Sequence, residues 1–184
     1  MKFLFFIAIL ILSVGCRRGP SGTADPQEIY MSQFKAFCGN SYRGETVFPK
    51  GGKDPFAGKQ LTLHFRECGR RENRLQFQVG DDLSRTWVLT NTRQGLQLKH
   101  DHRKPDGTPD EVTMYGGTAQ EGGTGRSQSF PADEHTAKLI PAGKNNIWTI
   151  EFSANKEILS YTLKRDGNLR YQANFNLMQP LAKK

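Results

Sequence analysis

Two histidines and three aspartates lie within residues 87–115, where two strand-like runs flank a polar loop. His100 and His102 are two positions apart, so in a β-strand both side chains project from the same face. Imidazole nitrogens at this spacing suit a transition metal if a third ligand joins them. Asp106 and Asp110, in the loop that follows, can supply a carboxylate as this third ligand, or can bind calcium instead. These four residues form the candidate ligand-binding site.

Counting from Leu96 and Leu98, both histidines fall on the inward phase of their strand. His64 is another candidate third ligand, but it is out of phase with the apolar face of its own strand. The loop also lacks the alternating ligands of an EF-hand. The simpler interpretation places His100 and His102 at the mouth of a barrel, hydrogen-bonded to loop carboxylates. Metal binding by these two histidines stays open as the alternative, and no cofactor is expected.

No complete catalytic motif occurs in the sequence. The serines lack a nucleophile elbow, and no cysteine is expected to be free. The glycine pairs at 116–117 and 122–123 do not lie between a strand and a helix, as a phosphate-binding loop requires. Carboxylate pairs of the glycosidase kind can be drawn from residues 110–111 and 133–134, but most surfaces offer such pairs. An envelope enzyme using the loop of His100, His102, Asp106 and Asp110 is therefore an alternative to a binding protein.

Apolar residues alternate with polar ones through most of the chain after residue 42. This period of two is typical of half-buried antiparallel strands. Asp166-Gly167 supplies a hairpin turn between the last two runs. The clearest inward-facing residues are Leu61, Leu63, Phe65, Leu75, Phe77, Val79, Trp148, Ile150, Phe152, Leu159, Tyr161, Leu163, Leu169, Tyr171, Ala173, Phe175 and Leu177.

The turn-rich composition, with 19 Gly and 9 Pro among 184 residues, indicates an all-β fold. We expect an antiparallel meander that closes into a barrel of about eight strands, because closure removes exposed sheet edges. Such a barrel is similar to the lipocalin or avidin class. A β-sandwich is the alternative. Residues 116–144 are polar and Gly-rich and are predicted to form long loops with one or two short strands.

A short helix is predicted before the strands. Asp25 is suited to cap it, Pro26 to occupy its first turn and Gly39 to end it. An aromatic stripe on one face predicts that the helix plugs one end of the barrel, with an aromatic lid over a cavity as the alternative. The stripe consists of Tyr30, Phe34, Phe37 and Cys38.

The amino terminus resembles a bacterial lipoprotein signal. A lysine and an apolar run at 3–12 precede three small residues and Cys16, although Ser13 stands where Leu is usual. The run is too short to span a bilayer comfortably. The resemblance implies that residues 1–15 are a signal peptide. It also implies that Cys16 is the lipidation site, carrying diacylglycerol and an amide-linked acyl chain such as palmitate.

The same resemblance implies a domain organisation for the chain and a location for the protein. Residues 16–24 would form a flexible polar tether, and residues 25–184 a single barrel domain. Membrane lipid would be the partner through acylated Cys16, with the domain in the cell envelope, facing the periplasm or the exterior. Arg17 rather than Asp after the lipidated residue favours the outer membrane in a Gram-negative host.

Cys38 and Cys68 are the two cysteines that remain. An even pair in an exported domain most often forms a disulfide. The closed loop of about 30 residues would contribute roughly 3–4 kcal/mol on the chain-entropy model.

The formal net charge is +8, which falls to about +7 when Lys2 leaves with the leader. This excess favours anionic partners in the envelope, such as lipid headgroups or wall polymers, rather than nucleic acid. Four arginines around the first clear hairpin are the candidate basic patch, with a solvated hairpin tip as the simpler interpretation. They are Arg66, Arg70, Arg71 and Arg74.

Five segments resemble a family of exported bacterial proteins without an assigned activity. The segments are 85–90, 95–103, 106–110, 112–117 and 130–133. The resemblance implies an exported domain and transfers no catalytic residue. The expected function is that of a lipid-anchored envelope lipoprotein that binds a small or hydrophobic ligand or an envelope component. The third possibility is a structural or interaction protein with a solid core.

Overall fold

The computed structural model describes residues 25–51 and 54–182. The predicted signal peptide, the lipidation site Cys16 and the tether lie outside the described residues. Ten antiparallel strands form one sheet. They are β1 (Ser41–Phe48), β2 (Leu61–Cys68), β3 (Glu72–Val79), β4 (Asp82–Thr92), β5 (Gly95–His102), β6 (Tyr115–Thr118), β7 (Ser127–Pro131), β8 (Asn146–Phe152), β9 (Ile158–Arg165) and β10 (Asn168–Pro180).

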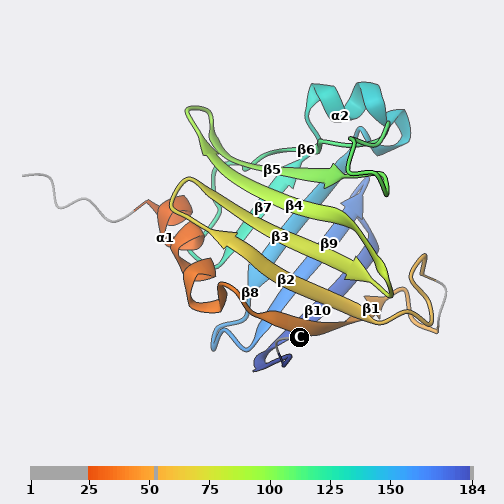
Figure 1. Cartoon of the computed structure of the whole chain (residues 1–184). Helices are drawn as coiled ribbons and strands as arrows, with labels where there is room; N and C mark the ends of the chain where they lie inside the picture. The colour runs from red at the N-terminus through yellow and green to blue at the C-terminus, as the bar shows by residue number, and fades with distance from the viewer. Residues whose placement is uncertain (1–24, 52–53, 183–184) are drawn as a thin grey trace, which may run out of the picture.

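The sheet is a meander that curls into a nearly closed barrel (Figure 1). Consecutive strands are neighbours throughout, except that β1 pairs with β10, and β6 and β7 are left as the two edges. The predicted all-β meander with a short N-terminal helix is confirmed. The expected strand number of about eight was wrong. The two additional strands are short: β6 has two glycines among its four residues, so it shows no side-chain alternation, and β7 alternates over only five residues.

The barrel closes at a seam where Gly116 and Gly117 of β6 meet residues 131–133. The amide of Asp133 donates to the carbonyl oxygen of Gly116 at 2.9 Å. The hydroxyl of Thr136 lies 2.7 Å from the amide nitrogen and 2.8 Å from the carbonyl oxygen of Gly116. A Cβ atom at position 117 would overlap the carbonyl oxygen of Pro131. The glycine pair therefore lets two backbones approach more closely than a side chain permits.

Residues 116–144 contain the short strands β6 and β7, in line with the prediction of long loops with one or two short strands, but helix α2 (Glu134–Leu139) was not predicted. Asp133 caps it by accepting a hydrogen bond from the amide of Thr136 at 2.9 Å. The helix is only six residues long, so it has too few turns to show an apolar period in the sequence. In the described part of the chain, no helix has both the length and the apolar character needed to cross a membrane.

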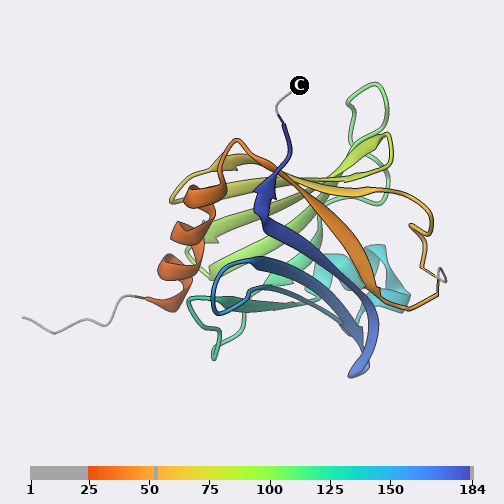
Figure 2. The same cartoon turned by 90° about the horizontal axis from the view of Figure 1, so that it is seen from below.

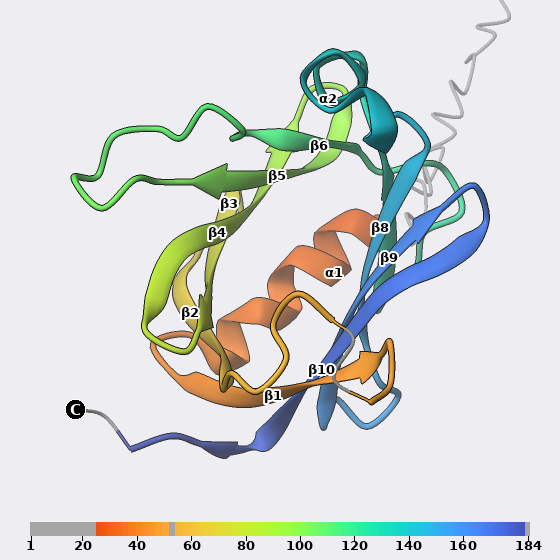
Figure 3. The ribbon, with the colours of Figure 1, turned by 90° about the vertical axis from the view of Figure 1, so that its right-hand side faces the viewer.

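Helix α1 (Pro26–Gln33) lies across one end of the barrel and continues into the short helix η1 (Phe34–Phe37) (Figures 2 and 3). Asp25 accepts from the amide of Gln27 at 2.9 Å, as its capping role predicts. The hydroxyl of Tyr30 donates to the carbonyl oxygen of Ile150 at 3.2 Å. Phe34 is fully buried and packs edge-on against the ring of Phe152. The helix plugs this end of the barrel, as the aromatic stripe predicts.

The predicted disulfide between Cys38 and Cys68 is present, with the two Cα atoms 5.8 Å apart. It joins the residue that follows η1 to the last residue of β2. The plug is thereby covalently tied to the wall of the barrel.

Candidate functional site

A cavity of about 370 Å³ lies at the end of the barrel away from α1. Its walls come from the later parts of β3, β5 and β9 and the earlier parts of β4, β8 and β10, which meet at this end. No described residue of α1 lines it. The volume falls within the range of small-molecule sites. The barrel is thus plugged at one end and hollow near the other.

Aromatic side chains form most of the cavity wall. The rings of Trp87 and Tyr161 stack with centroids 4.3 Å apart, and the ring of Phe77 also stacks against Trp87, at 5.3 Å. Phe56, from the connection between β1 and β2, packs edge-on against Phe77. These rings offer flat apolar faces to a ligand. The seven aromatic lining residues are Phe56, Phe77, Trp87, Tyr115, Trp148, Tyr161 and Tyr171.

His100 lies buried at the floor of the cavity. Its Nδ1 is 3.2 Å from the carbonyl oxygen of Tyr115, and its Nε2 is 2.9 Å from the hydroxyl of Tyr161. Since a carbonyl oxygen only accepts, Nδ1 carries the proton and Nε2 accepts from Tyr161. Burial lowers the pKa of His100 to about 3, and the nearby charges of His102 and Lys99 act in the same direction. The imidazole is therefore neutral near pH 7.

His102 lines the same cavity, closer to its rim. Its Nε2 lies 3.1 Å from the hydroxyl of Tyr115, and its amide donates to the hydroxyl of Thr113 at 2.7 Å. Burial lowers the pKa of His102, and the guanidinium of Arg85 lowers it further. Burial also raises the pKa of Tyr115 to about 12. The two histidines thus share one inward face, as predicted, and both are paired with tyrosines.

Three arginines also line the cavity. Arg85 of β4 forms an ion pair with Asp82, and its guanidinium carbon lies 5.5 Å from the centre of the Phe56 ring. Arg165 of β9 donates from Nε to the Oδ1 of Asn146 at 2.8 Å. Arg170 of β10 is exposed and forms no ion pair with a carboxylate of residues 25–51 or 54–182. The rim is positively charged.

The structure does not bring the two loop aspartates into the cavity. Asp106 accepts from the amide and the hydroxyl of Thr108 at 2.9 and 2.6 Å and shapes an exposed turn. Asp110 is exposed, although its charge acts on the pKa of His102. The expectation that loop carboxylates hydrogen-bond to the histidines was wrong, because the paired partners are tyrosines.

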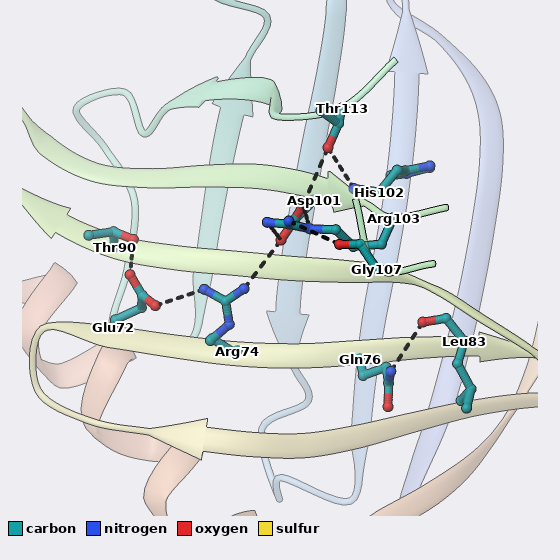
Figure 4. A network of polar contacts seen from close by, with 10 residues as sticks. All are labelled: Glu72, Arg74, Gln76, Leu83, Thr90, Asp101, His102, Arg103, Gly107 and Thr113. Atoms are coloured by element: carbon teal, nitrogen blue, oxygen red, sulfur yellow. Dashed lines mark hydrogen bonds and ion pairs between the residues drawn. The ribbon is translucent and has the colours of Figure 1, made fainter. Parts of the chain in front are cut away.

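The buried carboxylate of this region is Asp101, which faces away from the cavity on the outer side of β5 (Figure 4). Arg103 donates to it at 2.8 Å and Arg74 at 3.3 Å. Arg74 also pairs with Glu72 at 3.1 Å. The hydroxyl of Thr113 lies 3.4 Å from the same carboxylate. This network holds the loop after β5 against the outside of the barrel.

Only two of the four arginines predicted to form a basic patch lie together. Arg70 and Arg71 line a second, wider hollow beside α1, together with Arg93. Arg74 belongs to the Asp101 network, and Arg66 donates to Gln76 on the outer face of β2 and β3.

The lining of the cavity is aromatic and basic. Among its described lining residues there is no serine, threonine, cysteine, aspartate or glutamate to act as nucleophile or carboxylate base. Both histidines already hold tyrosine hydroxyls. No group of three or more His, Cys, Asp or Glu arranged to hold a metal occurs within residues 25–51 and 54–182. His100 could ligate a metal only by breaking a hydrogen bond to Tyr115 or Tyr161, since both of its ring nitrogens are paired, whereas His102 has only Nε2 paired.

The three arginines and most of the aromatic wall were not predicted from the sequence as site residues. Arg165 follows Leu163 on the inward phase of its strand, so alternation alone could have identified it. Arg170 could not have been found this way, since it lies at a register shift between Leu169 and Tyr171. Such irregularities re-aim side chains.

No protein-family model matches the chain, and comparison with curated proteins finds no sequence relative. The resemblance to a lipoprotein signal and to exported bacterial proteins therefore stays a prediction.

Proposed function

We propose that this chain is a lipid-anchored protein of the cell envelope whose barrel binds a small ligand in the cavity beneath His102. The observation that carries the proposal is the cavity of about 370 Å³ itself. A barrel with a purely structural role is expected to fill its interior with side chains, as the half next to α1 does. A space walled by seven aromatic residues at the other end favours binding.

The comparison with lipocalin-like or avidin-like barrels is an analogy of architecture. Those barrels hold one small ligand in an otherwise packed interior. This barrel has ten strands, but it too is packed at one end and hollow at the other, which supports a ligand site at the hollow end. Acylation of Cys16 would hold the barrel at a membrane surface, where a small ligand can be retained in the envelope.

The test is to fill the cavity and measure binding of the neutral dye N-phenylnaphthylamine. Leu163 is half-buried and lines the cavity, so Leu163→Trp adds bulk inside it. Leu83 is 48 % exposed and is not among the lining residues. Leu83→Trp therefore makes the same substitution outside the cavity.

We expect saturable dye fluorescence with the wild-type protein and with Leu83→Trp. Binding to Leu163→Trp should weaken by about tenfold or more, which corresponds to about 1.4 kcal/mol. Circular dichroism and the unfolding midpoint would establish that both variants fold. Equal dye affinity for all three proteins, or no saturable binding to the wild type, would overturn the proposed cavity site.

A further inference from the structure

We propose that the ligand of this cavity is a planar aromatic acid, with its ring among the tryptophans and its acidic group at Arg165 and Arg170. This inference rests on the proposed function and adds the chemical class of the ligand. It depends on three features of the described residues: the charge of the lining, the unused donors at the rim, and the aromatic faces at the floor, where the polar atoms of His100 and the hydroxyl of Tyr161 are already paired.

The charge of the lining is positive. Its ionisable side chains are three arginines, two histidines and three tyrosines, and no carboxylate occurs among the described lining residues. The histidines are neutral near pH 7, since burial lowers the pKa of both. The tyrosines are neutral as well, because burial raises their pKa values. Only the guanidinium groups carry charge, so the cavity attracts anions and repels cations.

Two of these arginines have guanidinium N–H groups without a hydrogen-bond partner among the described residues. Arg165 uses Nε on Asn146 at 2.8 Å, and its terminal nitrogens have no partner within the described part of the chain. This anchoring bond holds the guanidinium plane in place. Arg170 has neither an ion pair nor a hydrogen bond to another described side chain. A guanidinium fork of this kind matches a carboxylate, a sulfonate or a phosphate.

The backbone brings these two side chains to the same place. Arg165 ends β9 and Arg170 lies near the start of β10, on the two sides of the Asp166-Gly167 turn. Leu169 and Tyr171 are on the inward phase, so regular alternation would point Arg170 outward. The register shift between Leu169 and Tyr171 removes that constraint, and Arg170 lines the cavity.

The floor offers ring faces, and the polar atoms of its histidine and tyrosine are already paired with each other or with the backbone. The hydroxyl of Tyr161 donates to Nε2 of His100, and Nδ1 of His100 donates to the carbonyl oxygen of Tyr115. Trp87 stacks on Tyr161, and Trp148 lies 5.1 Å from the His100 ring. A ligand group at this depth therefore gains most from flat apolar contact. The two ends of the cavity thus favour opposite ends of one amphipathic molecule.

The test compares three probes that share one ring system: naphthoate, the neutral naphthalenemethanol and the cationic naphthylmethylammonium. Binding to the purified protein is measured by calorimetry and by tryptophan fluorescence. We expect naphthoate to bind at least about tenfold more tightly than the alcohol, and the cation to bind most weakly. High salt should reduce the preference for naphthoate.

Two double variants locate the acidic group. Arg165→Gln with Arg170→Gln should abolish the preference for naphthoate while affinity for the alcohol stays within about twofold of wild type. Arg66→Gln with Arg93→Gln removes the same charge from exposed positions outside the cavity and should keep the preference.

The outcomes separate this inference from the proposed function. Naphthoate and the alcohol could bind equally well, with the binding of both blocked by Leu163→Trp. That result would overturn the inference that the ligand is an acid and would leave the proposed small-ligand cavity standing. If the Arg66 and Arg93 variant loses the preference for naphthoate as fully as the Arg165 and Arg170 variant does, the preference comes from net charge. That result would also overturn the inference that the acidic group binds at Arg165 and Arg170. No binding of any of the three probes would overturn both proposals.

Discussion

Nε2 of His100 lies 2.9 Å from the hydroxyl oxygen of Tyr161, and the two residues come from strands that are not neighbours in the sheet. His100 is on β5 and Tyr161 is on β9, so this hydrogen bond crosses the interior of the barrel. On its other side, His100 donates to the backbone of Tyr115 on β6. One neutral imidazole therefore links three walls and forms the floor of the cavity.

The buried, neutral imidazole of His100 predicts that the folded protein loses stability in acid. The ordinary pKa of histidine is 6.5, and that of His100 in the folded protein is about 3 because burial penalises the charged ring. Between these values the unfolded chain binds a proton that the folded protein does not. The free energy of unfolding therefore falls as the pH decreases from 6.5 towards 3. One such group contributes at most about 1.4 kcal/mol per pH unit, and its contribution is fully present above pH 6.5.

Denaturant unfolding as a function of pH measures this effect. His100→Gln should be less stable than wild type at neutral pH and should show a shallower decline on acidification. Some decline remains in the variant, since the pKa values of His64 and His102 are also lowered. His135→Gln, at an exposed position on α2, is the matched control and should keep the wild-type slope. Parallel curves for wild type and His100→Gln would contradict the prediction.

The disulfide should contribute about 3–4 kcal/mol, because Cys38 and Cys68 are 30 residues apart. Replacing both with alanine should lower the free energy of unfolding by about that amount. Chemical denaturation with and without reductant is the measurement. Reductant should destabilise the wild type and leave the double variant unchanged. Two freely alkylated thiols in the non-reduced protein would show that the bridge does not form.

The seam should be intolerant of side chains. Gly117→Ala places a methyl group on the carbonyl oxygen of Pro131, so one backbone must shift, at a cost of about 1–3 kcal/mol. Gly69→Ala is a milder comparison, since its new Cβ would lie 3.2 Å from the backbone oxygen of Glu72, a close contact that a small shift relieves. Thermal melts of both variants should rank Gly117→Ala as clearly less stable. Equal melting temperatures would mean that β6 and β7 are not held this closely.

Removing the charge of Asp101 should loosen the loop after β5. Its side chain is 5 % exposed and binds Arg74 and Arg103, whereas those arginines are partly exposed and can regain water. Asp101→Asn should therefore cost about 1–2 kcal/mol. Asp106→Asn, in the exposed turn, should cost less. Proteolysis of the loop and urea unfolding would measure both effects, and an equal loss in the two variants would contradict the network's role.

Lipid anchoring is tested at Cys16. Cys16→Ser should abolish labelling with a palmitate analogue and release the domain into the soluble fraction. Cys16→Ala also removes the thiol and should give the same two results. Unchanged membrane fractionation of both variants would refute anchoring through this residue.

Side-chain alternation predicted the fold well because most strands have one face in a packed core. Leu61 to Phe65 and Ala173 to Leu177 follow the period of two that burial imposes, and their inward residues are buried. Strand β6 could not be predicted in this way. Two of its four residues are glycines, so its strand geometry depends on neighbouring backbone and leaves no pattern of side chains.

The candidate site was predicted in part for the same reason. His100 and His102 were correctly placed on the inward face, because β5 is regular. Their partners, Tyr161 and Tyr115, come from strands whose distance from β5 depends on the curvature of the whole barrel. Asp106 was assigned to the site because it follows β5 closely, yet its own turn holds it in solvent.

The pairing of β1 with β10 makes the barrel depend on its most distant strands. Thr46 of β1 lies opposite Ala173 of β10, although nearly all of the domain's chain separates them. A chain synthesised from its amino end must therefore keep β1 with one unpaired edge until the last strand is available. Contacts of such long sequence separation form slowly, and an open edge invites pairing with another chain. The exposure time of β1, more than the final stability, should set how much newly made protein aggregates.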